Sequence, residues 1–251
     1  MNKYTKNLNR IEFLVTFACT GRCKHCSEGD HSADGEHLDG DVAAEAVKKI
    51  AGQYKIESLM TFGGEPLLYS DTVCKIHGAA RDVNIPKRQL ITNGFFTKDI
   101  EKIHSVAREI AKSGINDVLL SVDAFHQETI PIEPVKIFAE AVKAEGVRLR
   151  THPAWLVGKE AENPYNKRTL EILREFEQMG ITVSSGNVIF PRGNAMKYLG
   201  EYFDFSKEQV DPYAENPEDM RAISFKPNGN VLGGNIYQSD ILDIISKYVP
   251  K

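Results

Sequence analysis

Short apolar runs alternate along the chain with longer segments in which apolar residues recur every three or four positions. The short runs predict strands at Ile11–Phe17, Ser58–Phe62, Gln89–Thr92, Asp117–Val122, Val147–His152 and Ile181–Phe190. The longer segments predict helices at Asp41–Tyr54, Asp71–Asn84, Asp99–Ser113, Glu133–Glu145 and Asn166–Met179. Glycines that suit helix ends follow three of these helices, at Gly114, Gly146 and Gly180. A strand–helix alternation of this kind indicates an α/β fold with a parallel sheet.

The number of strand–helix units limits the architecture. Six units are too few to close an eight-stranded barrel, so the pattern predicts an open, partial (β/α)6 barrel of the TIM type. In parallel barrels the chemically active side chains collect at the carboxyl ends of the strands. We expect the barrel to span residues 1–195 and a short hairpin and helix extension to span residues 196–251.

Composition narrows the class of protein without naming a function. The chain has 251 residues, 41% of them hydrophobic and 26% charged, which suits a globular protein with a large core. Its formal charge of −4 and the lack of a basic stretch argue against a nucleic-acid partner. No apolar run approaches the about 18 residues of a membrane span, and the polar start Met1–Asn7 does not resemble a signal peptide. We therefore expect a cytoplasmic protein with no membrane partner.

Three of the four cysteines lie close together, directly after the first predicted strand. Cys19, Cys23 and Cys26 can hold three irons of an iron–sulfur cube and leave the fourth iron open to another ligand. Such an open iron is what a reactive cluster needs. Cys74 lies far along the chain in a predicted helix, where it is poorly placed to supply a fourth thiolate.

Two other uses of these cysteines compete with an iron–sulfur cluster. A disulfide is disfavoured, because a cytosolic chain keeps its thiols reduced. Zinc is the stronger alternative, since His25, His31 or His37 could complete a site of three cysteines and one histidine. Structural zinc sites usually join two separated ligand pairs, however, and the sequence offers no second pair. The triplet therefore favours iron–sulfur and leaves zinc open.

Polar residues also gather at the predicted ends of the other strands. Gly63-Gly64-Glu65-Pro66 follows the second strand, Asn93 follows the third, and Ser121 and Asp123 end the fourth. In the fifth strand Arg148, Arg150 and His152 share one face. Charged residues are unusual in a buried parallel strand, so they indicate a polar interior that holds a ligand. The alternative is that these arginines pair with acidic residues for structural reasons.

The cysteine triplet, with its x3 and x2 spacing, and the Gly63-Gly64-Glu65-Pro66 segment together resemble the radical S-adenosylmethionine (radical SAM) superfamily. His25 fills the position before the third cysteine, where that family usually has a ring-bearing residue. The Ser121-Val-Asp123 strand end and the number of strand–helix units also fit, and the resemblance covers roughly residues 8 to 195. A zinc site would give no reason for the glycine pair. The resemblance implies an enzyme with one [4Fe–4S] cluster that cleaves SAM to a 5′-deoxyadenosyl radical, which takes a hydrogen atom from a substrate.

The resemblance also implies roles for individual residues. Cys19, Cys23 and Cys26 would hold the cluster, and Gly63, Gly64 and Glu65 would form the site for the SAM amino group. SAM would be bound further by His25, by Asn93, Ser121 and Asp123 at the ribose and carboxylate, and by Arg150 at the carboxylate. His126 could be an acid or base on the substrate side or simply a loop residue, and the role of His152 stays open.

The end of the chain resembles, and departs from, the tail of peptide-modifying members that carry auxiliary clusters. Phe225–Tyr237 has their turn chemistry, but glycines stand where a cysteine would be expected, and the tail contains no cysteine. We therefore expect one cluster, about four irons per chain. The Asn228-Gly229 pair predicts a hairpin turn, and Ser239–Tyr248 predicts a helix that caps the open side of the barrel through Ile241, Ile244, Ile245 and Val249. Pro191-Arg192-Gly193-Asn194 resembles another segment of the same members.

Three functions are compatible with these patterns. The favoured one is a radical SAM enzyme that acts on a small molecule or a peptide and receives electrons from a flavodoxin- or ferredoxin-type reductant. The second is an activating enzyme that installs a glycyl radical on a partner protein, which the chain length and the lack of auxiliary cysteines allow. The third is a zinc-binding scaffold without catalysis. The sequence does not identify the substrate.

Overall fold

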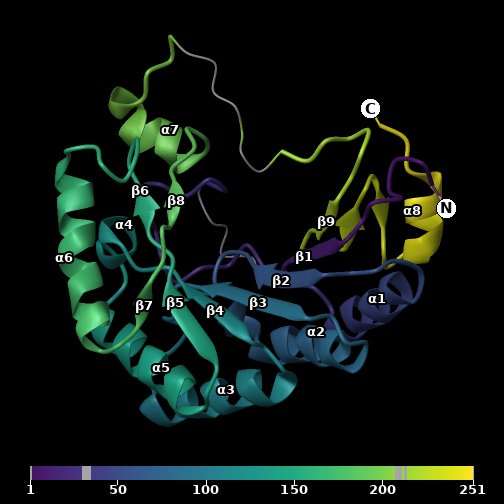
Figure 1. Cartoon of the computed structure of the whole chain (residues 1–251), viewed down its shortest axis with the longest axis horizontal. Coiled ribbons are helices and arrows are strands. Elements are labelled where there is room, and N and C mark those ends of the chain that lie inside the picture. The colour runs from purple at the N-terminus through teal and green to yellow at the C-terminus, as the bar shows by residue number, and fades with distance from the viewer. Residues whose placement is uncertain (1, 30–34, 207–210, 212–213, 251) are drawn as a thin grey trace.

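Seven parallel strands form the central sheet of the protein (Figure 1). The structure is a computed structural model and describes residues 2–29, 35–206, 211 and 214–250. The strands are β1 (Arg10–Leu14), β2 (Ser58–Phe62), β3 (Lys87–Thr92), β4 (Asp117–Leu120), β5 (Arg148–Thr151), β7 (Thr182–Val183) and β9 (Ala222–Phe225). They lie in the order β7-β5-β4-β3-β2-β1-β9. The sheet therefore ends at β7 on one side and at β9 on the other, and its curvature makes it a partial barrel, as the sequence predicted.

Helices cover the outer face of this curved sheet (Figure 1). The long ones are α1 (Gly40–Gln53), α2 (Ser70–Asp82), α3 (Ile100–Ser113), α5 (Ile132–Ala144) and α6 (Pro164–Gln178). All five were predicted, with ends that agree within two residues. Their starts follow from capping: the side chain of Asp39, for example, accepts hydrogen bonds from the first backbone amides of α1. Short helical turns complete the fold: η1 (Pro66–Tyr69), α4 (Ala124–Gln127), α7 (Asn194–Leu199), η2 (Gly200–Tyr202) and α8 (Ile241–Lys247).

Alternation along the strands separates an apolar outer face from a polar inner one. In β1, Ile11 and Phe13 are fully buried in the core beneath α1 and α2, whereas Arg10 and Glu12 point to the other face and form an ion pair of 2.6 Å. The same core includes residues of β9 and α8. A second apolar core lies between β3, β4 and β5 and the helices α3, α5 and α6. The two apolar cores therefore fix the strands from the outer face of the sheet, and with them the loops that follow the strands.

The sixth predicted strand, Ile181–Phe190, is wrong as a single element. It is split into β7, which pairs with β5, and β8 (Asn187–Val188), which pairs with β6 (Ala154–Trp155) in a separate two-stranded sheet. Gly186 lies between the two with a φ of +69°, and a side chain there would collide with the carbonyl oxygen of Pro153. The segment therefore leaves the main sheet after two residues. The first predicted strand also ends early, at Leu14 instead of Phe17.

The tail contains an element that the sequence analysis did not predict. β9 pairs in parallel with β1, from Ala222 opposite Arg10 to Phe225 opposite Phe13. The Asn228-Gly229 turn follows it, then a small hairpin of β10 (Asn230–Val231) and β11 (Gly234–Asn235), and then α8. A hairpin and a helix are both present in the tail, but the paired strands flank Leu232-Gly233 and not the predicted Asn228-Gly229 turn. Val249 lies beyond α8 and is 64% exposed. The tail extends the sheet at the β1 edge and packs on α1, so it covers that edge of the open barrel (Figure 1).

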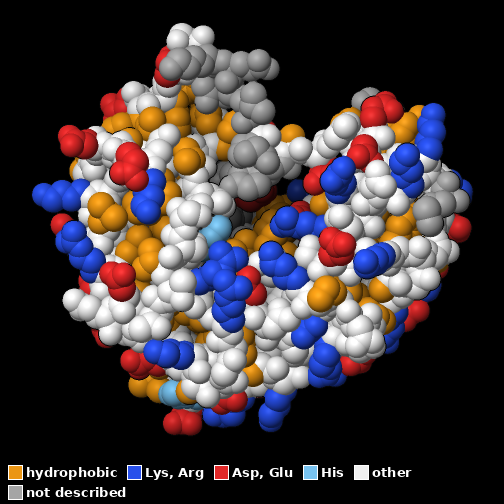
Figure 2. All heavy atoms as spheres, in the orientation of Figure 1, with side chains coloured by type: hydrophobic (Ala, Val, Ile, Leu, Met, Phe, Trp, Pro, Cys, Tyr) orange, Lys and Arg blue, Asp and Glu red, His pale blue; other side chains and the backbone are white. Residues whose placement is uncertain are grey.

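The space-filling view shows the surface hollowed between the part that carries α7 and the part that carries β9 (Figure 2). Among the described residues, no helix combines the length and apolar character needed to cross a membrane.

Candidate functional site: a cysteine loop at the carboxyl ends of the strands

The three clustered cysteines lie on the loop that leaves the carboxyl end of β1. Cys23 is 7% exposed, and Cys19 and Cys26 are half-buried. Burial raises the pKa of the Cys19 thiol to about 11 and also raises the pKa of Cys23 and Cys26. The neighbouring thiols add to the shifts of Cys19 and Cys23, so the three sulfurs lie close enough to affect one another's ionisation. Among the described residues, which include all four cysteines of the chain, there is no disulfide.

The three thiols are a donor set that suits three corners of an iron–sulfur cube. Buried thiols that oppose one another's ionisation need a nearby positive charge to become thiolates, and a metal centre supplies that charge. The three donors are sulfurs on one short loop, which is the chemistry that iron–sulfur clusters take.

The glycine pair after β2 lets this loop approach the sheet closely. The backbone amides of Gly64 and Glu65 donate to the carbonyl oxygens of Thr16 and Ala18, at 2.7 and 2.8 Å. A side-chain carbon on Gly64 would lie 2.1 Å from the carbonyl oxygen of Ala18, and one on Gly63 would lie 2.6 Å from that of Thr16. Gly63 also has a φ of +149°. The pair is therefore required by the packing of the cysteine loop, a role in addition to the predicted one toward SAM.

Glu65 ties the second strand end to the third. Its side chain is fully buried, and its carboxylate accepts hydrogen bonds from Leu67 N, Thr92 Oγ1 and Asn93 N at 2.9, 2.7 and 2.8 Å. Burial raises the pKa of Glu65 to about 7, although these three donors oppose the shift. A carboxylate that accepts these bonds from two strand ends is a rigid support for the site.

Asn93, at the end of β3, faces the cysteine loop. Its Nδ2 lies 3.2 Å from Thr20 Oγ1 and 3.6 Å from Cys19 Sγ, and its Oδ1 accepts from Phe95 N at 2.8 Å. The structure thus brings together the cysteine triplet, the glycine pair, Glu65 and Asn93, which are far apart in the sequence.

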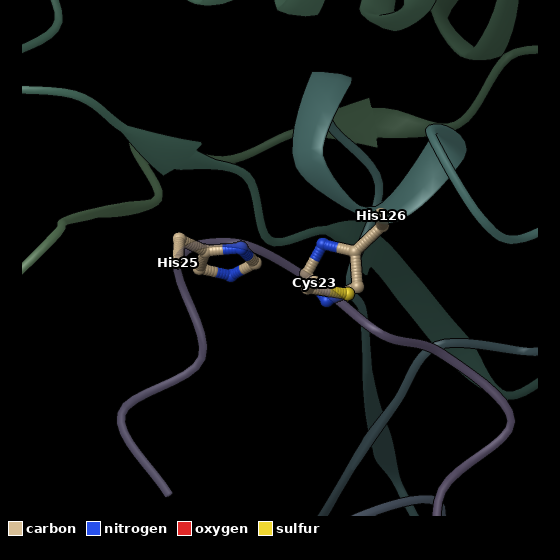
Figure 3. Close-up of side chains that lie close together, drawn as sticks. All are labelled: Cys23, His25 and His126. Atoms are coloured by element: carbon tan, nitrogen blue, oxygen red, sulfur yellow. The ribbon is translucent and has the colours of Figure 1, made fainter. Parts of the chain in front are cut away.

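Two histidines converge on one member of the triplet: the side chains of Cys23, His25 and His126 point toward one another (Figure 3). The first two come from the cysteine loop and His126 from α4. The His25 ring lies 4.8 Å from the His126 ring and 5.0 Å from the Phe125 ring, and its Nδ1 is buried without a hydrogen-bond partner among the described residues. Burial, reinforced by His126, lowers the pKa of His25 to about 4. The His25 side chain is therefore a neutral ring within the cysteine loop.

Asp123 organises this region from the end of β4. It is fully buried, caps α4 through Phe125 N and His126 N, and accepts from Ala154 N and from Nδ1 of His126, both through Oδ2. Burial alone would raise the pKa of Asp123, but His126 outweighs it and holds the pKa far below its usual range. These bonds within the protein use both carboxylate oxygens, so the predicted contact with SAM stays a prediction.

Arg150 lies on the inner face of β5 and is paired within the protein. Its Nε and Nη2 lie 3.2 and 3.1 Å from the two carboxylate oxygens of Asp117, and Gln89 Nε2 donates to the same carboxylate at 2.8 Å. Burial alone would raise the pKa of Asp117, but the hydrogen bonds from Arg150 and Gln89 outweigh burial and lower the pKa below its usual value. This is the structural pairing that the sequence left as an alternative. Among the described residues, the hydrogen bonds and the ion pair of Arg150 go to Asp117 and not to the cysteine loop, and its predicted role at the SAM carboxylate stays a prediction.

The other predicted residues divide between the site and its surroundings. Ser121 is 9% exposed and continues the pairing of β4 with β3 through its amide, which donates to Thr92 O at 2.8 Å. His152 faces Asn187, with 2.9 Å between Nε2 and Nδ2. His37, one histidine of the zinc alternative, stacks on Tyr69, and His31 lies outside the described residues. Cys74 lies in α2, where it packs against the second apolar core, away from the triplet, as predicted.

A distant segment also holds the cysteine loop, and the sequence analysis did not assign it a role. Asn194, at the start of α7, is 7% exposed. Its backbone amide donates to Cys26 O at 2.9 Å, and its side-chain Nδ2 donates to Cys23 O and Gly29 O at 3.3 and 3.4 Å. Gly193 has a φ of +56°, and a side chain there would lie 2.4 Å from Ser27 O. In the sequence, the Gly193-Asn194 pair after the sixth predicted strand was the only sign of this contact that could have been noticed. It marks where the chain returns to the loop.

Comparison with known proteins agrees with this geometry. The model of the Radical SAM superfamily matches residues 13–205. The chain belongs to the radical SAM superfamily. It is therefore an enzyme, and its family's cofactors are a [4Fe–4S] cluster and SAM.

The curated relatives are much longer than the matched region. A GTP 3′,8-cyclase of Clostridium perfringens is 25% identical over 98% of this chain and 64% of its own length. A probable GTP 3′,8-cyclase of Methanocaldococcus jannaschii is 24% identical over 51% of this chain and 40% of its own length. The chain thus spans less than two thirds of these relatives.

Solved structures show the same fold at low sequence identity. The structure of anSMEcpe with bound AdoMet has a TM-score of 0.60 at 16% identity and covers 95% of this chain and 80% of its own. Streptococcus suis SuiB bound to the precursor peptide SuiA has a TM-score of 0.61 at 14% identity and covers 95% of this chain and 64% of its own. These likenesses confirm the partial barrel. At this level of sequence identity they do not identify the substrate of this protein.

Proposed function

We propose that this protein uses Cys19, Cys23 and Cys26 to hold one [4Fe–4S] cluster, reductively cleaves SAM, and removes a hydrogen atom from a small molecule or a peptide. The observation that carries the proposal is the docking of the three-cysteine loop onto the ends of β2 and β3, through Gly64, Glu65 and Asn93. When bound, the cluster supplies an electron and SAM supplies the 5′-deoxyadenosyl radical.

The protein's own residues would orient these cofactors and exclude water. The backbone of Gly63 and Gly64 and the neighbouring Glu65 would line the SAM amino group, and Asn93 and Ser121 would offer neutral hydrogen-bonding groups to the rest of SAM. His25 would present its neutral ring beside the cluster. Family members need a dry site to protect a radical, and the buried Glu65 and Asp123 anchor the loops that would provide it.

A nucleotide is the substrate class that the curated relatives favour. The clostridial relative is named as a GTP 3′,8-cyclase and aligns with nearly the whole of this chain. A peptide is the class suggested by the SuiB structure, which holds a precursor peptide. GTP and a set of short peptides are therefore the first candidates to add to the reconstituted enzyme. Electrons would come from a flavodoxin- or ferredoxin-type protein in place of dithionite.

Anaerobic reconstitution tests the proposal. Iron and sulfide analysis should give about four irons per chain, and dithionite should then produce 5′-deoxyadenosine and methionine from SAM. Cys23→Ala should lose both properties, whereas Cys74→Ala, the matched control outside the site, should keep them. Formation of S-adenosylhomocysteine without deoxyadenosine would sink the mechanism. A reproducible count of about eight irons, falling to about four when the three clustered cysteines are replaced, would reveal a second cluster.

A further inference from the structure

Cys23, His25 and His126 form a ligand set that differs from the cysteine triplet. One ligand atom from each side chain, a sulfur and two ring nitrogens, lies within 4.8 Å of the others, and the three side chains converge (Figure 3). Only Cys23 is shared with the triplet. The set therefore joins the cysteine loop to α4, whereas the triplet lies within the loop.

The support behind His126 is of the kind found behind metal-binding histidines. Oδ2 of the buried Asp123 lies 2.9 Å from Nδ1 of His126, which fixes the proton on that nitrogen and leaves Nε2 with a lone pair for a metal ion. Asp123 is itself held by the amides of Phe125 and Ala154. A carboxylate that orients a histidine in this way is common around zinc.

A second observation is the orphaned nitrogen of His25. Its Nδ1 is buried and finds no hydrogen-bond partner among the described residues. Buried polar atoms without a partner are rare and call for a ligand or another explanation. The aromatic rings of Phe125 and His126 pack against His25 and hold it next to Cys23.

We propose that, when the chain carries no iron–sulfur cluster, Cys23, His25 and His126 bind one Zn²⁺-class ion, with water as the fourth ligand. Bonds of about 2.0–2.3 Å place tetrahedral ligands about 3.5 Å apart, so the present spread of 4.8 Å must close by about an ångström, which side-chain rotation provides. Because both centres need the Cys23 sulfur as a terminal ligand, the ion and the cluster should exclude each other. The mutual exclusion rests on the proposed function, whereas the binding of the ion does not.

Cobalt titration of the reduced, cluster-free protein tests the site. Co²⁺ should bind at one ion per chain and show the charge-transfer band of a thiolate–cobalt bond together with the visible bands of a tetrahedral ion. Cys23→Ser should remove the charge-transfer band. His126→Gln and His25→Gln should each weaken cobalt binding by about 10–100-fold or more. Loss of a residue that only supports a ligand already costs about 10–100-fold.

Controls separate this ligand set from the triplet. Cys19→Ser and Cys26→Ser should still bind cobalt with the wild-type spectrum, and so should His104→Gln, which changes a histidine on α3 outside the site. Thermal melts of every variant establish that it is folded; where one histidine variant fails to fold, the other decides. Loss of the cobalt spectrum in Cys19→Ser and Cys26→Ser, or its survival in Cys23→Ser, would overturn the assignment.

Competition tests the exclusion. Protein loaded with Zn²⁺ should form the cluster more slowly on addition of iron and sulfide than zinc-free protein, and this delay should shrink in His126→Gln. Equal rates with and without zinc would overturn the exclusion. A chain that binds cobalt as described but forms no cluster under any condition would refute the proposed function and leave the divalent site standing.

Discussion

At the residue scale, Gly64 is the position in the site where a side chain would collide most severely with its surroundings. Its missing side chain allows the loop backbone at Ala18 to approach within hydrogen-bond distance of β2's end. The obstacle to a larger residue is backbone, which cannot rotate away as a side chain can.

Replacing Gly64 with alanine should loosen the cysteine loop. We expect Gly64→Ala to lower the free energy of unfolding by about 1–3 kcal/mol and to reduce iron retention after reconstitution. Gly78→Ala is the matched control, because a side-chain carbon at Gly78 meets nothing within 4 Å and the position lies inside α2. That variant should be neutral or more stable by up to about 1 kcal/mol. Urea unfolding and iron analysis measure both, and equal behaviour of the two variants would contradict the packing role.

His77 gives a pH dependence outside the site. It is fully buried in α2, its Nε2 lies 2.9 Å from Thr61 Oγ1, and burial lowers its pKa from 6.5 to about 3. The unfolded chain therefore binds the proton more readily, so stability from this group is present above pH 6.5 and is lost as the pH falls toward 3.

Between pH 7 and pH 5, this histidine should cost the native protein about 2 kcal/mol. His77→Gln, which can keep a hydrogen bond to Thr61, should remove that part of the acid sensitivity. Urea unfolding at the two pH values checks the difference between wild type and variant. An unchanged difference would mean that His77 is protonated in the folded protein.

At the element scale, the start of α7 holds the cysteine loop from a distant part of the chain. Asn194 donates to carbonyl oxygens of Cys23, Cys26 and Gly29, and Gly193 makes the approach possible. We expect these hydrogen bonds to keep the sulfurs in place for the proposed cluster.

Asn194→Ala should therefore speed the loss of iron to a chelator several-fold while leaving the fold intact. The substitution removes the side-chain bonds to Cys23 O and Gly29 O and leaves the backbone bond to Cys26 O. Asn166→Ala is a matched control, since the Asn166 side chain also donates to backbone carbonyls, of Leu156, Gly158 and Ala161, in a loop without cysteines. It should lower stability by a similar amount, about 1–3 kcal/mol, without changing iron release. Chelator kinetics and thermal melts on the two variants separate the roles; equal iron release from both would contradict a specific role for Asn194.

At the scale of the whole molecule, the tail completes the sheet and the core next to the first strand. β9 covers the β1 edge, and the Phe225 ring stacks on Phe13 with 4.6 Å between ring centres. α8 adds Ile241, Ile244 and Ile245 to the same apolar core as α1. The strand that leads into the cysteine loop is thus an inner strand, protected on both sides.

Removing the tail's main aromatic contact should destabilise the whole protein. Phe225→Ala should lower the free energy of unfolding by about 3–5 kcal/mol, because the ring is fully buried. Phe205→Ala, at a ring that is 52% exposed, should change it by no more than about 0.5 kcal/mol. Urea unfolding compares the two; a tail that folds apart from the barrel would leave the barrel's transition unchanged in Phe225→Ala.

The sequence by itself determined the elements and the chemistry that are written in neighbouring residues. The long helices follow from apolar residues spaced by three and four, and the sulfur ligands follow from three cysteines on one loop, because both signals are local. The tertiary structure decided what depends on distant partners: β9 lies beside β1, Asn194 on the cysteine loop, and Arg150 on Asp117. Periodicity reports which face of a strand or helix is buried, but not which distant segment covers it. A short strand such as β9 and a side chain with several possible partners are therefore placed only when the chain folds.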